Sequence, residues 1–144
     1  MNVTFTFEKL LDAFVNPRIR GIASKGGTRS GKTWAVLQLL HLLCKSNEKP
    51  LIVSCVGATL PAVKRGMLRD FKAMLLSENE WDEEAFNKSE GSYTYPSGGM
   101  IEFFGVDNAS KVHGPARDIL FVNEAQNIPR EIFRQLDVRT PVSY

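Results

Sequence analysis

The sequence contains little cysteine, and this scarcity excludes two common architectures of small proteins. It has two cysteines, Cys44 and Cys55, among 144 residues. They have neither the spacing of paired metal ligands nor the number that a disulfide framework requires. Both lie in apolar runs, where cysteine usually behaves as a small hydrophobic side chain. We therefore expect a reducing, cytoplasmic setting.

Long hydrophobic runs and an export signal are also missing. The longest strongly apolar patch, residues 39–44, is far shorter than the roughly 20 residues that span a bilayer. The N-terminus has no basic segment followed by an apolar one, so no signal peptide is expected. The net charge of +2 is too small to indicate a nucleic-acid partner. Basic residues are concentrated in the first half of the chain, but solvated helix faces explain that distribution equally well.

The sequence does have the composition and element order of one α/β domain. Hydrophobic residues make up 43% and charged residues 24%, as in a soluble globular protein. Apolar periodicity predicts helices over residues 3–15, 32–45, 61–76 and 130–136. Runs rich in β-forming residues predict strands over residues 20–24, 51–56, 92–95, 100–104 and 119–122. The strands on either side of Pro96 to Gly99 should form a β-hairpin, residues 77–90 an acidic surface excursion, and residues 108–115 a loop.

A phosphate-binding loop is the clearest motif. Residues 26–33 read G-G-T-R-S-G-K-T and match G-x-x-x-x-G-K-[ST] in full. The glycines let the backbone N–H groups point at phosphate oxygens, and the following helix directs its positive end at the same anion. Lys32 reaches the β- and γ-phosphates, and the Thr33 hydroxyl is placed to bind Mg²⁺. We therefore assign ATP binding, with Mg²⁺ as cofactor, to Gly26, Gly27, Thr28, Arg29, Ser30, Gly31, Lys32 and Thr33.

A second motif, I-L-F-V-N-E-A at residues 119–125, follows the pattern of a buried strand that ends in polar side chains. Ligands of open α/β sheets bind at the ends of such strands. Glu124 can orient the attacking water or accept its proton. Asn123 stands where an Asp normally holds the water shell of the magnesium ion, so we expect it to act through water. The alternative is a helix-capping Asn followed by a surface Glu.

Three arginines are candidates for contact with the transition state. Arg29 lies inside the phosphate loop, where a guanidinium can reach the γ-phosphate or Glu124. Arg65 and Arg69 are four residues apart on one face of a helix, a position from which arginine fingers can act on a neighbouring subunit. A solvated loop and a solvated helix face are the alternatives. The acidic run of residues 82–84 is interpreted as surface charge rather than a metal cluster.

Four segments together resemble the ATPase part of the large terminase subunit of tailed phages. The resemblance covers residues 10–140 and depends most on the predicted hairpin, the Lys111-Val112-His113-Gly114 segment and Asn123-Glu124-Ala125. In order, the segments read G-G-T-R-S-G-K-T, G-A-T-L-P-A-V-K-R-G-M-L-R-D-F, G-G-M-I-E-F-F-G-V-D-N-A-S-K-V-H-G and D-I-L-F-V-N-E-A-Q. Some terminases of this group also carry Asn-Glu-Ala where others carry Asp-Glu-Ala.

The resemblance implies a P-loop NTPase of the ASCE type, a three-layer sandwich with a mostly parallel sheet and a β-hairpin. It further implies a motor that hydrolyses ATP to drive double-stranded DNA through the portal protein into a procapsid. Such a motor works in the host cytoplasm as a homo-oligomeric ring, together with the small terminase subunit. By position, Lys32, Arg29 and Glu124 take catalytic roles, and Thr33 and Asn123 take the magnesium side.

Large terminases normally continue past this region into a strand with a coupling motif and then a nuclease domain. We therefore expect residues 1–144 to form a partial ATPase domain, whose sheet is incomplete at the C-terminal end and which does not cleave DNA. Two alternatives stay open. One is a non-catalytic chain that binds nucleotide or terminase partners, and the other is another P-loop DNA-dependent ATPase.

Overall fold

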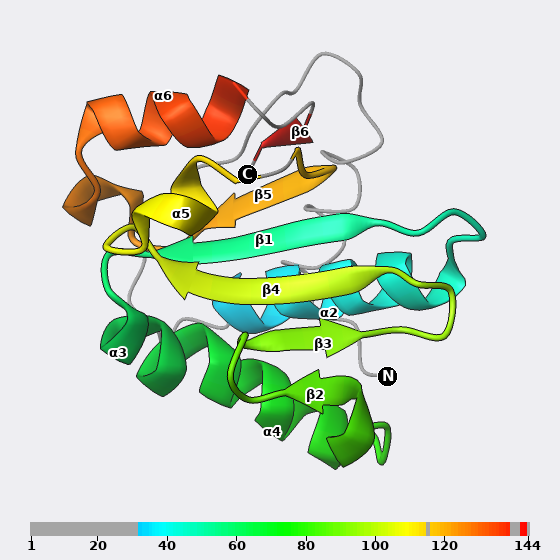
Figure 1. Cartoon of the computed structure of the whole chain (residues 1–144). Coiled ribbons are helices and arrows are strands. Elements are labelled where there is room, and N and C mark those ends of the chain that lie inside the picture. The colour runs from blue at the N-terminus through cyan, green and yellow to red at the C-terminus, as the bar shows by residue number, and fades with distance from the viewer. Residues whose placement is uncertain (1–31, 115, 139–141, 144) are drawn as a thin grey trace.

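The computed structural model describes residues 32–114, 116–138 and 142–143 (Figure 1). The predicted helix over residues 3–15, the predicted strand over residues 20–24 and the loop residues Gly26 to Gly31, Arg29 among them, lie outside this part. Its helices are α2 (Lys32–Ser46), α3 (Leu60–Val63), α4 (Arg69–Ser77), α5 (Ala109–Val112) and α6 (Arg130–Val138). Its strands are β1 (Ile52–Gly57), β2 (Phe86–Asn87), β3 (Ser92–Thr94), β4 (Met100–Gly105), β5 (Ile119–Val122) and β6 (Val142–Ser143).

These strands form one sheet in the order β2-β3-β4-β1-β5-β6 (Figure 1). Strands β4, β1, β5 and β6 run parallel to one another, whereas β2 and β3 are antiparallel to their neighbours. The predicted hairpin is confirmed, because β3 pairs with β4 from Ser92 opposite Glu102 to Thr94 opposite Met100. The predicted strand over residues 51–56 is confirmed as the central parallel strand β1.

Alternating side chains divide the core between the two faces of the sheet. In β1, Val53 and Cys55 pack with α2, α3 and α4, whereas Val56 packs with α6 on the opposite face. Strands β4 and β5 alternate in the same way, which is the period of two that pleated strands impose. Helices therefore cover both faces, and the predicted three-layer α/β fold with a mostly parallel sheet is confirmed. Both cysteines are free and buried, as expected of small hydrophobic side chains.

The helix predicted over residues 61–76 forms, but it is not a uniform α-helix. The Thr59 side chain caps it by accepting a hydrogen bond of 3.3 Å from the Ala62 N–H. Between α3 and α4, residues Lys64–Leu68 form a π-helical turn. The predicted apolar stripe faces the core, with Val63, Met67, Phe71, Met74 and Leu75 buried. No helix in residues 32–114 and 116–138 is long and apolar enough to cross a membrane.

Three segments differ from the sequence-based expectations. The acidic excursion is partly structured, since Trp81 and Phe86 pack against the core and the chain forms a 3₁₀ turn at Glu83–Ala85. The predicted loop over residues 108–115 contains the short helix α5, which the Asn108 side chain caps. Strand β6 pairs with β5 at one edge of the sheet. Sequence analysis did not expect β6, because two residues are too few to show a strand pattern.

Candidate functional site

The parallel strands bring the predicted site residues to one edge of the sheet. Strands β1, β4 and β5 all end at the left of Figure 1, and α2 begins at that same edge. Lys32 and Thr33 are the first two residues of α2, and Asn123 and Glu124 directly follow β5. The carboxyl edge of an open parallel sheet is where such folds bind ligands. The structure therefore places the described residues of both motifs on the side of the sheet where a ligand is expected.

The beginning of the helix at Lys32 is confirmed, and Thr33 is 3% exposed. Gly26, Gly27, Thr28, Arg29, Ser30 and Gly31 lie outside the described residues, so their contacts with phosphate stay predictions. Thr33, Asn123 and Glu124 offer hydroxyl, amide and carboxylate oxygens. These are the hard oxygen donors that magnesium prefers, so the donor set on this edge fits the predicted ion.

Glu124 has an unusual backbone conformation. Its φ of 54° is left-handed, and Asn79 is the only other non-glycine residue of the described segments with a positive φ. Such a conformation costs about 1–2 kcal/mol in a residue that carries a Cβ atom. The Asn123 N–H donates to the Val56 carbonyl at 2.9 Å, and the Asn127 N–H donates to the Glu124 carbonyl at 2.9 Å. Hydrogen bonds of the strand before Glu124 and of the 3₁₀ turn after it, Ala125–Asn127, therefore hold its backbone in this strained conformation. Strained residues of this kind often occur at functional sites.

The Glu124 side chain is half-buried, and its Oε2 accepts a hydrogen bond of 3.4 Å from the Asn127 side chain. Asn123 continues the β5 ladder rather than beginning a helix. Asn123 and Glu124 instead form the end of a buried strand and a tight turn at the carboxyl edge.

The candidate arginines on the second helix are both exposed. Arg65 lies in the π turn, and Arg69 begins α4. Their position leaves them accessible to another molecule, so a role in trans stays a prediction. The acidic run of residues 82–84 is surface charge, as expected, because the Asp82 side chain caps the following 3₁₀ turn. Within the described part of the chain, no group of three His, Cys, Asp or Glu side chains could hold a metal ion.

A buried polar network crosses the sheet face opposite α2, and sequence reasoning missed it. Arg117 is 3% exposed, and its Nε donates to the Ser54 hydroxyl at 2.9 Å. The Ser54 hydroxyl donates to Glu102 Oε1 at 2.6 Å, and Lys111 Nζ lies 3.5 Å from Glu102 Oε2. Arg117 also donates to the carbonyls of Leu136 in α6 and of Lys111. A charged residue just before a buried strand was the one signal of this network in the sequence.

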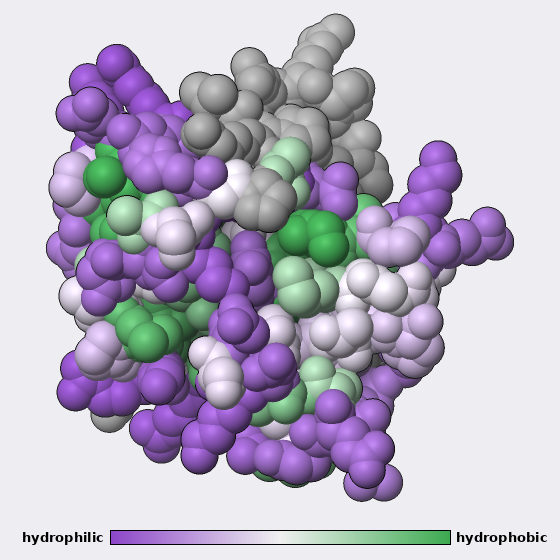
Figure 2. All heavy atoms as spheres, in the orientation of Figure 1, coloured by the Kyte–Doolittle hydropathy of each residue, from purple (hydrophilic) through white to green (hydrophobic). Residues whose placement is uncertain are grey.

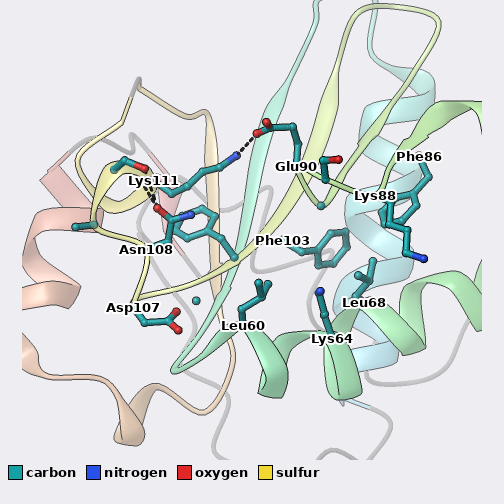
Figure 3. Close-up of a pocket in the computed structure, with 16 residues that line it drawn as sticks. Leu60, Lys64, Leu68, Phe86, Lys88, Glu90, Phe103, Asp107, Asn108 and Lys111 are labelled. Atoms are coloured by element: carbon teal, nitrogen blue, oxygen red, sulfur yellow. Dashed lines mark hydrogen bonds and ion pairs between the residues drawn. The ribbon is translucent and has the colours of Figure 1, made fainter.

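A groove of about 730 Å³ lies beside the end of β4 and was likewise not predicted (Figure 3). Its walls come from the α3 and π-turn region, from the segment between β2 and β3, and from the start of α5. The residues that line it include Leu60, Lys64, Leu68, Phe86, Lys88 and Asp107. It opens at the edge that carries the motif residues, but it contains none of them.

Comparison with known proteins identifies a common fold. No family model matches the sequence, and no curated protein matches it significantly. Among solved structures, the large terminase from a thermophilic bacteriophage, in its second crystal form, matches with a TM-score of 0.77 and 17% identity. That match covers 99% of this chain and 38% of the terminase chain.

The same terminase in complex with ADP matches with a TM-score of 0.72 and 18% identity, over 99% of this chain and 38% of the other. Its complex with ATP-gamma-S matches with a TM-score of 0.70 and 17% identity, over 96% and 35%. This chain thus spans a little over a third of the terminase chains that it matches. At this identity the likeness establishes the fold, and we conclude that the chain has the fold of the ATPase portion of a phage large terminase.

Proposed function

We propose that this chain is the ATP-binding and ATP-hydrolysing motor portion of a phage large terminase, which powers packaging of double-stranded DNA into procapsids. The observation that carries the proposal is Glu124, which a left-handed turn holds at the end of β5 on the edge where α2 begins. The complete phosphate-loop motif at residues 26–33 and the fold shared with a terminase solved with ADP and ATP-gamma-S support it.

In this proposal each residue has a distinct chemical role. Lys32, Arg29 and the loop N–H groups bind and orient the triphosphate. Magnesium, when bound, neutralises charge on the phosphates, and the Thr33 hydroxyl and, through water, Asn123 would hold it. Glu124 orients a water molecule for in-line attack on the γ-phosphorus and takes its proton. The bond to the β–γ bridging oxygen breaks as the water oxygen bonds to phosphorus, so ADP and phosphate leave without a covalent enzyme intermediate.

The partners in this proposal are double-stranded phage DNA, the portal protein, the small terminase subunit and further copies of the chain in a ring. The terminase resemblance of the sequence supports this set of partners. The exposure of Arg65 and Arg69 makes them candidates for contact with ATP bound to a neighbouring copy. The work of this motor would take place in the host cytoplasm at the procapsid portal.

The test is ATP turnover by the full chain with and without double-stranded DNA. We expect turnover that DNA stimulates, and a Lys32→Ala variant that loses both ATP binding and turnover, because the phosphate charge then lacks its main cation. Lys49→Ala is the control, since Lys49 is an exposed lysine on the loop after α2. Equal turnover by wild type and Lys32→Ala would contradict the proposal. ATP binding without any turnover would favour the non-catalytic alternative.

A further inference from the structure

The groove beside the end of β4 has an apolar floor that is open to solvent. Leu60, Leu68 and Phe86 line this floor (Figure 3). Leu60 is 40% exposed, and only one other large hydrophobic residue of the described segments, Leu76, is this open. Figure 2 shows an apolar patch over the start of α3 surrounded by hydrophilic side chains. An exposed apolar patch with a polar rim is typical of a surface that binds another molecule.

Two lysines stand on the rim of this floor, and no described residue pairs with their ammonium groups. Lys64 projects from the π turn, and Lys88 from the segment between β2 and β3 (Figure 3). Neither ammonium group makes an ion pair with another residue in the described part of the chain. Lys111 also lines the groove, but Glu90 and Glu102 hold it at 3.4 and 3.5 Å. Two positive charges are therefore available to an incoming anion.

The helix that supplies one wall has an irregular backbone at the groove. Lys64 and Leu68 are the first and last residues of the π turn, and both line the groove. Single π turns inside α-helices are rare and are frequent at functional sites. The widened turn places one basic and one apolar side chain on the same surface. This pairing matches an occupant that is both acidic and apolar.

From these observations we propose that the groove binds a peptide segment of a partner protein in which apolar side chains stand beside carboxylates. The apolar residues would cover Leu60, Leu68 and Phe86, and the carboxylates would pair with Lys64 and Lys88. The volume of about 730 Å³ is within the range of sites that enclose several side chains. This role does not require ATP hydrolysis, and it goes beyond the proposed motor function.

The charges of the groove favour a peptide over a nucleic acid. Glu90 and Asp107 also line it, and both are exposed. A phosphate backbone is negative along its whole length and would meet these carboxylates, whereas a peptide can place its own carboxylates beside Lys64 and Lys88 alone. In a peptide, by contrast, Asp107 at one end of the groove can accept a backbone N–H or a basic side chain. The mixed charge and the apolar floor therefore fit a protein segment better.

The test is selection of twelve-residue peptides from a random displayed library on the full chain. We expect enriched peptides that combine Leu, Ile or Phe with neighbouring Asp or Glu. The affinity of the chain for one synthetic peptide is then measured by fluorescence anisotropy. Lys64→Glu and Lys88→Glu should each lower this affinity at least about tenfold, because like charges would then meet across the interface. Leu60→Ser should also weaken binding.

The matched control is Lys49→Glu, a reversal of the same charge at an exposed lysine outside the groove, which should bind the peptide as wild type does. Lys32→Ala should also bind normally, so failure of the motor function and failure of this proposal are distinguishable. Enriched peptides without acidic residues, or equal binding by Lys64→Glu and Lys49→Glu, would overturn the proposal. The proposal would also be overturned if Lys64→Glu lost duplex-DNA binding or self-association while its affinity for the peptide stayed unchanged.

Discussion

At the scale of single residues, the backbone of Glu124 best distinguishes a functional from a structural role. A glycine would adopt a φ of 54° without strain. The sequence instead has a glutamate there, at the end of a fully buried strand. Because strained residues cluster at functional sites, this outlier supports the role that we propose for the Glu124 carboxylate.

This interpretation predicts opposite changes in stability and activity. Glu124→Gly should raise the free energy of unfolding by about 1 kcal/mol, because the left-handed strain disappears, and it should abolish ATP turnover. Glu124→Ala removes the same carboxylate but keeps Cβ, so it should abolish turnover without the gain in stability. Urea denaturation measures the difference. If the two variants are equally stable, the backbone at this position is not strained.

His41 in α2 is the second informative residue, because it is 3% exposed between two polar partners. Its Nδ1 shares a hydrogen bond of 2.6 Å with the Tyr95 hydroxyl, and its Nε2 lies 3.6 Å from Glu80 Oε2. Burial lowers the pKa of His41 below 6.5, although Glu80 opposes the shift and Lys45 adds to it. The folded state therefore favours the neutral imidazole.

The sign of the pH dependence follows from this lowered pKa. Just below pH 6.5 the unfolded chain takes up a proton that the folded chain does not, so stability falls as the pH falls toward the folded pKa. Above pH 6.5 this contribution is fully present. We expect the free energy of unfolding of His41→Gln to change less with pH between pH 7 and the acidic range in which Glu80 titrates. Urea denaturation at a series of pH values measures this change. An unchanged slope in His41→Gln would show that another group controls it.

At the scale of elements, α6 is held near the sheet at its beginning and near its end. The chain enters it shortly after the Glu124 turn, and its Leu136 carbonyl accepts a hydrogen bond of 3.2 Å from Arg117. The same guanidinium contacts β1 through Ser54 and the end of α5 through the Lys111 carbonyl. One side chain thereby ties together one strand and two helices on this face of the sheet.

Removal of this side chain should be costly. Arg117→Met leaves the buried Leu136 and Lys111 carbonyls without this donor, and we expect a loss of about 3 kcal/mol in the free energy of unfolding. Arg130→Met on the exposed side of the same α6 should change stability by less than about 0.5 kcal/mol. Thermal or urea denaturation of the two variants makes the comparison. A similar small loss in both would mean that the network contributes little.

The elements also show what could be predicted from the sequence. Strands β1 and β5 and the helix after Thr59 were predicted because their apolar patterns are local and long enough to read. The π turn, β6 and the Arg117 network were not predicted. Two residues are too few to show the strand pattern of β6, and the network depends on contacts between segments far apart in the chain. Ser54 and Glu102, for example, meet only because β1 and β4 pair in one register. The two motifs could be recognised in the sequence because the spacing within each is local, and the roles of their residues stay predictions.

At the scale of the whole molecule, two surfaces share the carboxyl edge of the sheet. One combines the start of α2 with the turn after β5, and the other is the groove beside β4. The first offers hydroxyl, amide and carboxylate oxygens, and in our proposal Glu124 is its general base. The second has apolar and basic groups suited to a protein segment.

The most direct test of the central claim is the fate of bound ATP in wild type and in Glu124→Gln, which keeps the shape of the side chain but cannot accept a proton. With Mg²⁺, both should bind ATP with similar affinity. After a quench, wild type should contain ADP, whereas Glu124→Gln should retain intact ATP because its rate is lower by about 10²–10⁴-fold. If Glu124→Gln hydrolyses ATP as fast as wild type, Glu124 is not the general base and the account is wrong.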